Sequence, residues 1–232
     1  MQLSRQLGFS LLELLISLTL GFIISAAAIG LFINTANSDF HQLKTLRLNQ
    51  ELRGIMLLMV REIRRAAYLD PAGLSLLIGS GEWNPFIYDT NNNKRLFSLE
   101  RIDNSPTYNC ILFTSDQNAN GRLDEDEYFG YQRRYDTRSK NYTVKIGAKT
   151  ATSCNSGNWE SISDENTINI GELSFIPYPQ RIGQQQHLID CNIEIHLSGY
   201  LVSDPSVSLN LSESLSLRNP IYDPSGNAPI CQ

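Results

Sequence analysis

The residues with the clearest chemical pattern are oxygen-bearing side chains at fixed spacing in residues 116–127, which read DQNANGRLDEDE. This segment fits the D-x-[DN]-x-[DN]-G-x5-E pattern of a calcium loop, in which a glycine at the sixth place allows a sharp turn. The ligands predicted by this spacing are Asp116, Asn118, Asn120, the backbone carbonyl of Arg122, Asp124 (directly or through water) and Glu127. The sequence therefore predicts a Ca²⁺ site of modest affinity, with a solvated acidic turn as the alternative.

A second segment, DTNNNKRLFSLE at residues 89–100, matches the same pattern less well. Lys94 stands where the glycine is needed, and Phe97 occupies the ninth place. We interpret this segment as a turn, with a weak ion site as the alternative. The segments on both sides of residues 116–127, CILFTS and YFGYQRRY, have the composition of strands. The first loop is thus predicted to lie between strands and to act as a structural staple, not as a sensor.

The chain has four cysteines, and all of them follow the apolar N-terminal segment. If the later part of the chain is exported, these thiols are expected to form disulfides. Four cysteines allow three pairings. We favour Cys110–Cys154 with Cys191–Cys231, because each pair joins neighbours in the sequence. A zinc site is disfavoured, since no C-x-x-C motif or Cys/His pair has the spacing of zinc ligands.

The sequence does not support catalysis. His41, His187 and His196 are scattered, and the chain contains no G-x-S-x-G, P-loop, H-E-x-x-H or dinucleotide motif. The net charge of −5 over 232 residues disfavours general nucleic-acid binding, which needs a basic surface. The pair Arg133-Arg134 leaves a local basic patch open. We therefore expect neither an enzyme nor a nucleic-acid partner.

The elements that must hold these residues are strands beyond Pro71, where the helical period disappears. Apolar and polar residues alternate over 191–197 and 207–217, and the intervening Asp204-Pro205 predicts a turn between two antiparallel strands. Shorter strands are predicted at Cys110–Thr114, Tyr128–Tyr135, Tyr142–Ile146 and Glu172–Ile176, with irregular structure over 87–109 and 147–166. The predicted class is α+β, with a long N-terminal helix packed on an antiparallel sheet.

The N-terminal segment is long enough to span a membrane. Residues 14–38 carry no charge, and at about 1.5 Å per residue a helix of this length exceeds the ~30 Å hydrocarbon core. Arg5 precedes the segment and favours export of everything after it. A secretory signal cleaved after Ala26-Ala27-Ala28 and a plain membrane anchor are two interpretations. Neither explains Glu13, because a carboxylate inside an apolar helix is costly without a partner.

The string Gly8-Phe9-Ser10-Leu11-Leu12-Glu13 offers a third interpretation. It resembles the class III signal of type IV pilins and type II secretion pseudopilins. The resemblance implies that prepilin peptidase cleaves between Gly8 and Phe9, that Phe9 becomes an N-methylated terminus, and that the apolar segment is retained. Cleavage creates a cationic amine at Phe9, which Glu13 of a neighbouring subunit could pair with in the core of a fibre.

The helix is predicted to continue out of the membrane to about Tyr68 as an amphipathic segment. Apolar residues recur at three- and four-residue steps at Phe40, Leu43, Leu46, Ile55, Met59, Ile63 and Ala66. The string Arg61-Glu62-Ile63-Arg64-Arg65-Ala66-Ala67-Tyr68 resembles the RxxRxAGY-like helix end of the minor pilins of the PilW family, with Ala67 in place of the glycine. Its basic residues could form a solvated helix face or a subunit contact.

These resemblances imply a pilin fold with a leader at 1–8, a membrane and fibre-core helix at 9–38, an amphipathic helix at 39–70 and a β-rich periplasmic head at 71–232. They imply a minor pilin that helps to initiate pilus assembly, first in the inner membrane and then at the pilus tip. The implied partners are prepilin peptidase, other minor pilins, the major pilin and a tip adhesin. A GspJ-like minor pseudopilin of type II secretion and a signal-peptide-cleaved periplasmic calcium-binding module or enzyme are the alternatives.

Overall fold

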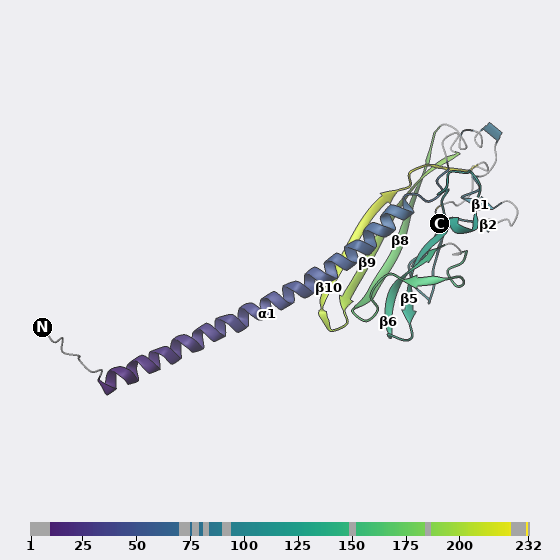
Figure 1. Ribbon diagram of the computed structural model, residues 1–232. Helices are drawn as coiled ribbons and strands as arrows, with labels where there is room; N and C mark the ends of the chain where they lie inside the picture. The colour runs from purple at the N-terminus through teal and green to yellow at the C-terminus, as the bar shows by residue number, and fades with distance from the viewer. Residues whose placement is uncertain are drawn as a thin grey trace. The chain divides into compact units, whose positions relative to one another are not determined.

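The computed structural model describes residues 10–69, 75, 79–80, 84–89, 94–148, 152–183, 187–223 and 231. The elements, shown in Figure 1, are α1 (Leu11–Ile63), β1 (Tyr88–Asp89), β2 (Lys94–Arg95), β3 (Ser98–Glu100), β4 (Cys110–Thr114), η1 (Glu125–Glu127), β5 (Tyr128–Asp136), β6 (Asn141–Ala148), β7 (Trp159–Ser161), β8 (Ile168–Ile182), β9 (Leu188–Leu201), β10 (Asp204–Ser216) and β11 (Ile221–Tyr222). One long helix followed by antiparallel strands confirms the predicted α+β, pilin-like architecture. The chain forms two compact units, residues 1–46 and 47–232.

The first unit contains the N-terminal part of α1, whose apolar side chains lie on every side of the helix. Leu18, Phe22 and Ile33 each expose more than half of their surface. Among the residues that the structure describes, α1 is the one helix long and apolar enough to cross a membrane. Glu13 is the only charged residue from Leu11 to Ser38. A helix that is apolar all round is suited to hydrocarbon or to contact with other helices, not to water.

The second unit is built on two antiparallel sheets. In one, β9 lies between β8 and β10, and β11 also pairs with β9. The other has the order β3-β4-β5-β6-β7, and β1 and β2 form a separate pair. The two larger sheets are joined beside β8, where the Arg133 Nε donates to the Ile170 carbonyl at 3.0 Å and the Phe175 amide donates to the Tyr108 carbonyl at 2.8 Å.

The C-terminal part of α1 (from residue 47) closes the core of this unit. Leu48, Leu52, Met59 and Ile63 are fully buried, in one cluster with sheet residues such as Phe175, Ile193 and Ile195. Figure 1 shows this part of the helix running alongside β8, β9 and β10. The approach is close at Gly199, where an added Cβ would lie 3.3 Å from a methyl of Leu52. A side chain at this position would therefore crowd Leu52 and also the Asn169 carbonyl, which would lie 3.2 Å from the added Cβ.

The predicted helix face was partly wrong. Ile55, Met59, Ile63 and Ala66 are buried as expected. Phe40, Leu43 and Leu46 are exposed, because they belong to the first unit, and Leu48 and Leu52 take the inward positions of the second. The inward face thus begins at Leu48, later than the apolar spacing suggested.

The helix also ends at Ile63, earlier than the predicted Tyr68. Residues 64–67 form a turn, and Ala67 has a φ of +61°, a left-handed conformation that suits glycine best. The Ala67 amide donates to the Thr114 carbonyl of β4 at 2.8 Å. This bond to β4 takes the chain out of the helix before Tyr68.

The predicted strands are all present, and several details differ. The turn between β9 and β10 lies at Val202 and Ser203, since Asp204 already pairs with Leu201. The segments expected to be irregular contain the short strands β1, β2, β3 and β7. These strands of two or three residues are too short to show an alternating pattern.

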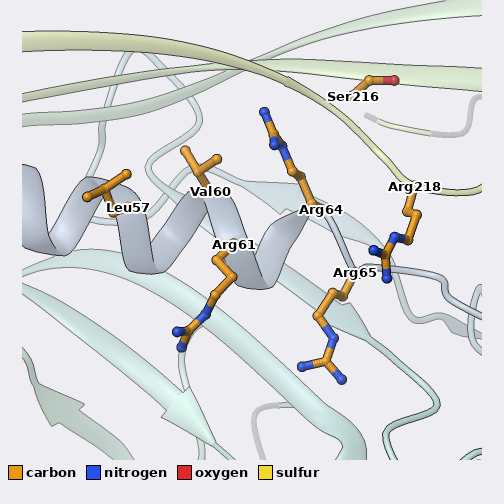
Figure 2. A pocket seen from close by; sticks show the side chains of 7 residues that line it. All are labelled: Leu57, Val60, Arg61, Arg64, Arg65, Ser216 and Arg218. Carbon is orange, nitrogen blue, oxygen red and sulfur yellow. The ribbon is translucent and has the colours of Figure 1, made fainter.

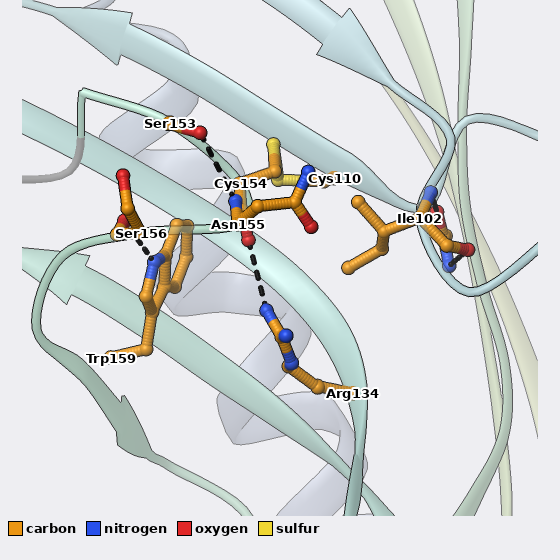
Figure 3. Close-up of a disulfide and its surroundings, with 9 residues drawn as sticks. Ile102, Cys110, Arg134, Ser153, Cys154, Asn155, Ser156 and Trp159 are labelled. Carbon is orange, nitrogen blue, oxygen red and sulfur yellow. Dashed lines mark hydrogen bonds between the residues drawn. A yellow bond between two sulfur atoms is a disulfide. The ribbon is translucent and has the colours of Figure 1, made fainter.

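The structure contains the disulfides Cys110–Cys154 and Cys191–Cys231, the pairing that the sequence analysis favoured. Cys110–Cys154 joins β4 to the segment before β7, where Leu112 belongs to the same buried cluster. Ile102 and Trp159 also pack around the disulfide (Figure 3). Cys191–Cys231 joins β9 to the C-terminal end of the chain. Each disulfide closes a loop of about forty residues, which limits the unfolded chain and stabilises the head by ~3–4 kcal/mol in the chain-entropy estimate.

Replacing a buried residue of α1 should destabilise the head strongly. Leu52 is fully buried, so Leu52→Ala should lower the free energy of unfolding by about 2–5 kcal/mol. Leu57 lies on the same helix with 68% of its surface exposed, and Leu57→Ala should change the free energy by less than about 0.5 kcal/mol. Urea denaturation of the full chain in detergent, followed by circular dichroism, measures both. Equal effects of the two substitutions would contradict the helix face described above.

Candidate functional site

Glu13 lies in the first turn of α1. It is at the start of the apolar part of the helix, residues 11–38, which we call the stem. The amides of Glu13 and Leu14 both donate to the Ser10 carbonyl, at 3.0 and 3.1 Å, so the helical turn begins at Ser10. Leu11, Leu12, Leu14 and Leu15 around the carboxylate are exposed. Within the described part of the chain no basic side chain pairs with Glu13. The two predicted processing residues, Gly8 and Phe9, lie outside the described residues.

The loop 116–127 connects β4 to β5 and is closed by its first and last carboxylates. Asp116 is buried, and its two oxygens accept the amides of Asn120 and Gly121, each at 3.1 Å. Glu127 is also buried, and its two oxygens accept the amides of Gln117 and Asp124, at 2.9 and 3.0 Å. Buried carboxylates need such donors, because an unpaired one is costly. The loop is therefore folded around Asp116 and Glu127.

The middle of the loop brings the other predicted ligands together. One oxygen of Asp124 accepts the side-chain amides of Asn118 and Asn120, both at 2.8 Å. These two hydrogen bonds, with a smaller contribution from Arg122, hold the pKa of Asp124 below its ordinary value. The Arg122 amide donates to the Asn120 side-chain oxygen at 2.7 Å. Gly121, with a φ of +71°, makes the sharp turn that the motif requires at its sixth place.

Backbone hydrogen bonds anchor this loop to the segment that follows α1. The Asp116 amide donates to the Tyr68 carbonyl at 3.2 Å, and the Ser115 amide donates to the Glu127 carbonyl at 3.3 Å. The predicted flanking strands are confirmed, since Thr114 of β4 pairs with Tyr128 of β5.

Over the described residues, no group of three or more His, Cys, Asp or Glu side chains is placed to hold a metal ion. In this loop the carboxylates of Asp116, Asp124 and Glu127 accept hydrogen bonds from backbone and side-chain amides.

The comparisons with known families cover both the stem and the head. Residues 3–29 match the prokaryotic N-terminal methylation motif, and residues 41–217 match prepilin peptidase-dependent protein B. The second match spans more than half of the chain. The chain belongs to the prepilin peptidase-dependent protein B (PpdB) family. No curated protein and no solved structure matches the chain.

Membership of the PpdB family confirms the pilin-like character and the dependence on prepilin peptidase. The methylation motif includes Gly8, Phe9 and Glu13, and the PpdB match includes the whole loop 116–127. The apolar helix and the motif together fit a protein that is anchored in a membrane before assembly. Pilin-like families consist of structural proteins.

The basic pair that the sequence analysis left open has structural roles in this PpdB-family chain. The Arg133 guanidinium lies 3.6 Å from the centre of the Tyr142 ring, and burial lowers its pKa. Arg134 donates to the Cys154 carbonyl at 3.1 Å, beside the disulfide (Figure 3). Because both arginines are engaged within the head, they do not form a free basic patch.

A second group of arginines was only partly visible in the sequence. Arg61, Arg64 and Arg65 were recognised as a basic cluster near the end of the helix. Arg218 lies beside them, because its amide donates to the Arg64 carbonyl at 2.9 Å. No local pattern relates Arg218 to the helix, so the sequence carried no signal for this contact.

Proposed function

We propose that this chain is a minor pilin, of the kind represented by the PilW family, that helps to initiate type IV pilus assembly. The observation that carries this proposal is the N-terminal methylation motif in front of an apolar helix whose only charge before Asp39 is Glu13. Such a stem is suited to pack beside other stems. The head then contacts other minor pilins in a priming complex, which remains at the tip beside a large adhesin.

The mechanism follows from the charge at the start of the stem. Prepilin peptidase cleaves between Gly8 and Phe9 and leaves a cationic amine at Phe9. In the inner membrane, Glu13 has no basic partner within the described part of its own chain and is costly in hydrocarbon. Pairing with the Phe9 amine of a neighbouring subunit removes that cost. Because one partner without the other is strongly unfavourable, the pair selects the register in which stems enter the fibre.

The mature N-terminus tests the first step. N-terminal sequencing and mass spectrometry of the protein from membranes should find a chain that begins at methylated Phe9. Cleavage needs the leader, so Gly8→Val should leave residues 1–8 attached. A mature terminus at Ile29 would indicate a signal peptide, and an intact Met1 would indicate a plain anchor. Either result would remove the proposed assembly mechanism.

Neutralising Glu13 tests the second step. Glu13→Gln keeps the shape of the side chain and removes its charge, so one buried pair is lost at a cost of about 3–5 kcal/mol. We expect about a hundredfold less protein in sheared pili, with unchanged amounts in the membrane. Asp39→Asn is the matched control on the same helix and should assemble normally. Quantitative immunoblots of membrane and pilus fractions measure both variants.

A deletion strain distinguishes the two kinds of fibre. Loss of surface pili and twitching, restored by the unaltered gene, is the expected result. Loss of exoprotein secretion with normal twitching would instead identify a GspJ-like minor pseudopilin of a type II secretion system. A strain normal in both respects would contradict both assignments.

We further propose that the loop 116–127 binds Ca²⁺ through Asp116, Asn118, Asn120, the Arg122 carbonyl, Asp124 and Glu127. Buried carboxylates at the first and last places and a left-handed Gly121 at the sixth support this proposal, because the motif places a carboxylate, a bidentate glutamate and a turn glycine at these places. The Asn118 and Asn120 amides donate to Asp124, so binding requires both side chains to turn their oxygens inward. The ion would supply positive charge at the centre of an acidic loop and so staple β4 to β5.

Calcium should therefore stabilise the protein, and Glu127 should be required. For the modest affinity of extracellular modules, 10 mM Ca²⁺ should raise the melting temperature by about 3–10 °C relative to chelator. Glu127→Gln should abolish this shift, whereas Glu125→Gln, at an exposed neighbour, should retain it. Differential scanning fluorimetry measures the shift, which separates metal binding from any general loss of stability. A parent protein that melts at the same temperature with and without calcium would show that the loop is a turn only.

A further inference from the structure

A pocket of about 590 Å³ lies at the C-terminal end of α1, within the second unit. It is lined by Leu57, Val60, Arg61, Arg64, Arg65, Ser216 and Arg218, as Figure 2 shows. We call these residues the arginine pocket. A pocket of this volume can hold a ligand with several functional groups, and it is larger than a single small ion needs.

The fold builds this pocket from two distant parts of the chain. Arg61, Arg64 and Arg65 leave the last turn of α1 and the turn that follows it at three- and four-residue spacing. Arg218 is brought to them by the backbone bond from its amide to the Arg64 carbonyl. The preceding Leu217 is buried, and its amide donates to the Cys191 carbonyl at 3.0 Å. The position of the fourth arginine is thus fixed by packing and hydrogen bonds.

The charge of the pocket is poorly balanced. Glu62 is the one acid paired with these arginines in the described part of the chain, and it lies 2.9 Å from Arg61 and 3.8 Å from Arg65. In the same part of the chain, the side chains of Arg64 and Arg218 make neither an ion pair nor a hydrogen bond. This excess of positive charge stands out on a chain whose net charge is −5. It would be neutralised by an anionic partner.

The arrangement favours an extended acidic segment over a single phosphate. Figure 2 shows the Arg64 side chain leaving the helix on the side where Ser216 lies, and the Arg61 and Arg65 side chains extending to the other side. Guanidinium groups spread in this way suit several carboxylates along a peptide, each held by a planar pair of donors. Leu57 adds an apolar contact, since 68% of its surface is exposed at the edge of the pocket. A matching segment would carry an apolar residue among its acids.

A lipid headgroup is a poorer match, because it presents one compact anionic group, whereas the guanidinium groups of the arginine pocket are spread apart (Figure 2).

We infer that the arginine pocket is the docking site for an acidic segment of a neighbouring pilin-like subunit. This inference rests on the proposed function and adds to it the kind of contact that the head makes. Carboxylates of the neighbour bind the guanidinium groups, and an apolar side chain covers Leu57. Because the pocket is lined from both the helix end and the end of β10, the contact fixes the orientation of the two heads.

A peptide of defined charge tests the chemistry. The full chain in detergent is titrated into fluorescein-labelled GELEELEG and into its neutral counterpart GQLQQLQG, and anisotropy reports binding. We expect binding of the acidic peptide only, weakened about tenfold by the Arg64→Glu/Arg218→Glu double variant and about threefold by Leu57→Ala. The Arg53→Glu/Arg138→Glu double variant has the same change in net charge at exposed sites outside the pocket and should bind normally.

Three results in this assay would overturn the inference. Equal weakening by both double variants would show attraction by net charge alone. Complete displacement by 10 mM inorganic phosphate, without displacement by equal potassium chloride, would indicate a site for a single anion. Competition by phosphatidylglycerol vesicles that phosphatidylcholine vesicles do not reproduce would indicate a lipid surface.

Cross-linking in cells tests the partner. A photoreactive benzoylphenylalanine replaces Leu57 in the full chain, and mass spectrometry identifies the adduct. The expected partner is another chain with an N-terminal methylation motif, joined at a segment with at least two acidic residues. The Arg64→Glu/Arg218→Glu background should remove this adduct, and the Arg53→Glu/Arg138→Glu background should retain it. An adduct with lipid, with a second copy of the same chain or with an unrelated protein would overturn the inference.

The two proposals can fail separately. If Glu13→Gln blocks assembly while the Arg64→Glu/Arg218→Glu variant assembles and cross-links normally, the pocket assignment fails and the minor-pilin proposal stands. If the pocket variant loses the adduct while a deletion strain keeps normal pili, the subunit contact stands and the role in pilus assembly fails.

Discussion

The rest of the head depends on the segment where the chain leaves α1, residues 63–68, which we call the exit. Burial of Ile63, Ala66 and Ala67 holds this exit in the core. Three backbone bonds then connect it to other elements: Ala67 to Thr114 of β4, Asp116 to Tyr68, and Arg218 to Arg64. Buried backbone groups must be paired, so these bonds set where β4, the loop 116–127 and the end of β10 can lie. The proposed calcium loop and the arginine pocket are therefore both positioned by the same few residues.

Much of this architecture could be predicted because several elements have one buried side. β9 alternates between buried and partly exposed positions from Ile189 to Leu197, and such a pattern gives both the strand and its inward face. The loop 116–127 was predicted from spacing alone, since its oxygen-bearing residues are close in sequence. The buried face of the helix was harder to predict, because apolar residues lie on every side of its N-terminal part. Phe40 and Leu46 therefore fitted the face of Ile55 equally well, although only Ile55 is buried.

The features that were not predicted depend on contacts between distant residues. Alanine favours helix, so the residue type itself does not mark Ala67 as left-handed, although the PilW-like string has a glycine at this place. Its conformation follows from the bond to β4 and is visible only once the sheet is formed. The meeting of Arg218 with Arg64 has the same origin. Packing between elements, and not local propensity, decides both.

The partners of other arginine side chains in the head show why the arginine pocket is unusual. Arg133 and Arg134 donate to backbone carbonyls, and Arg181 lies 3.0 Å from the buried carboxylate of Asp223. Arg47 lies 3.7 Å from Asp164. At the helix end, by contrast, Glu62 is the one acid paired in the described part of the chain, and it pairs with only two of the four arginines, Arg61 and Arg65. The like charges of this cluster repel one another. Salt screens this repulsion in a free subunit. An acidic neighbour would relieve it directly, by placing carboxylates beside Arg64 and Arg218.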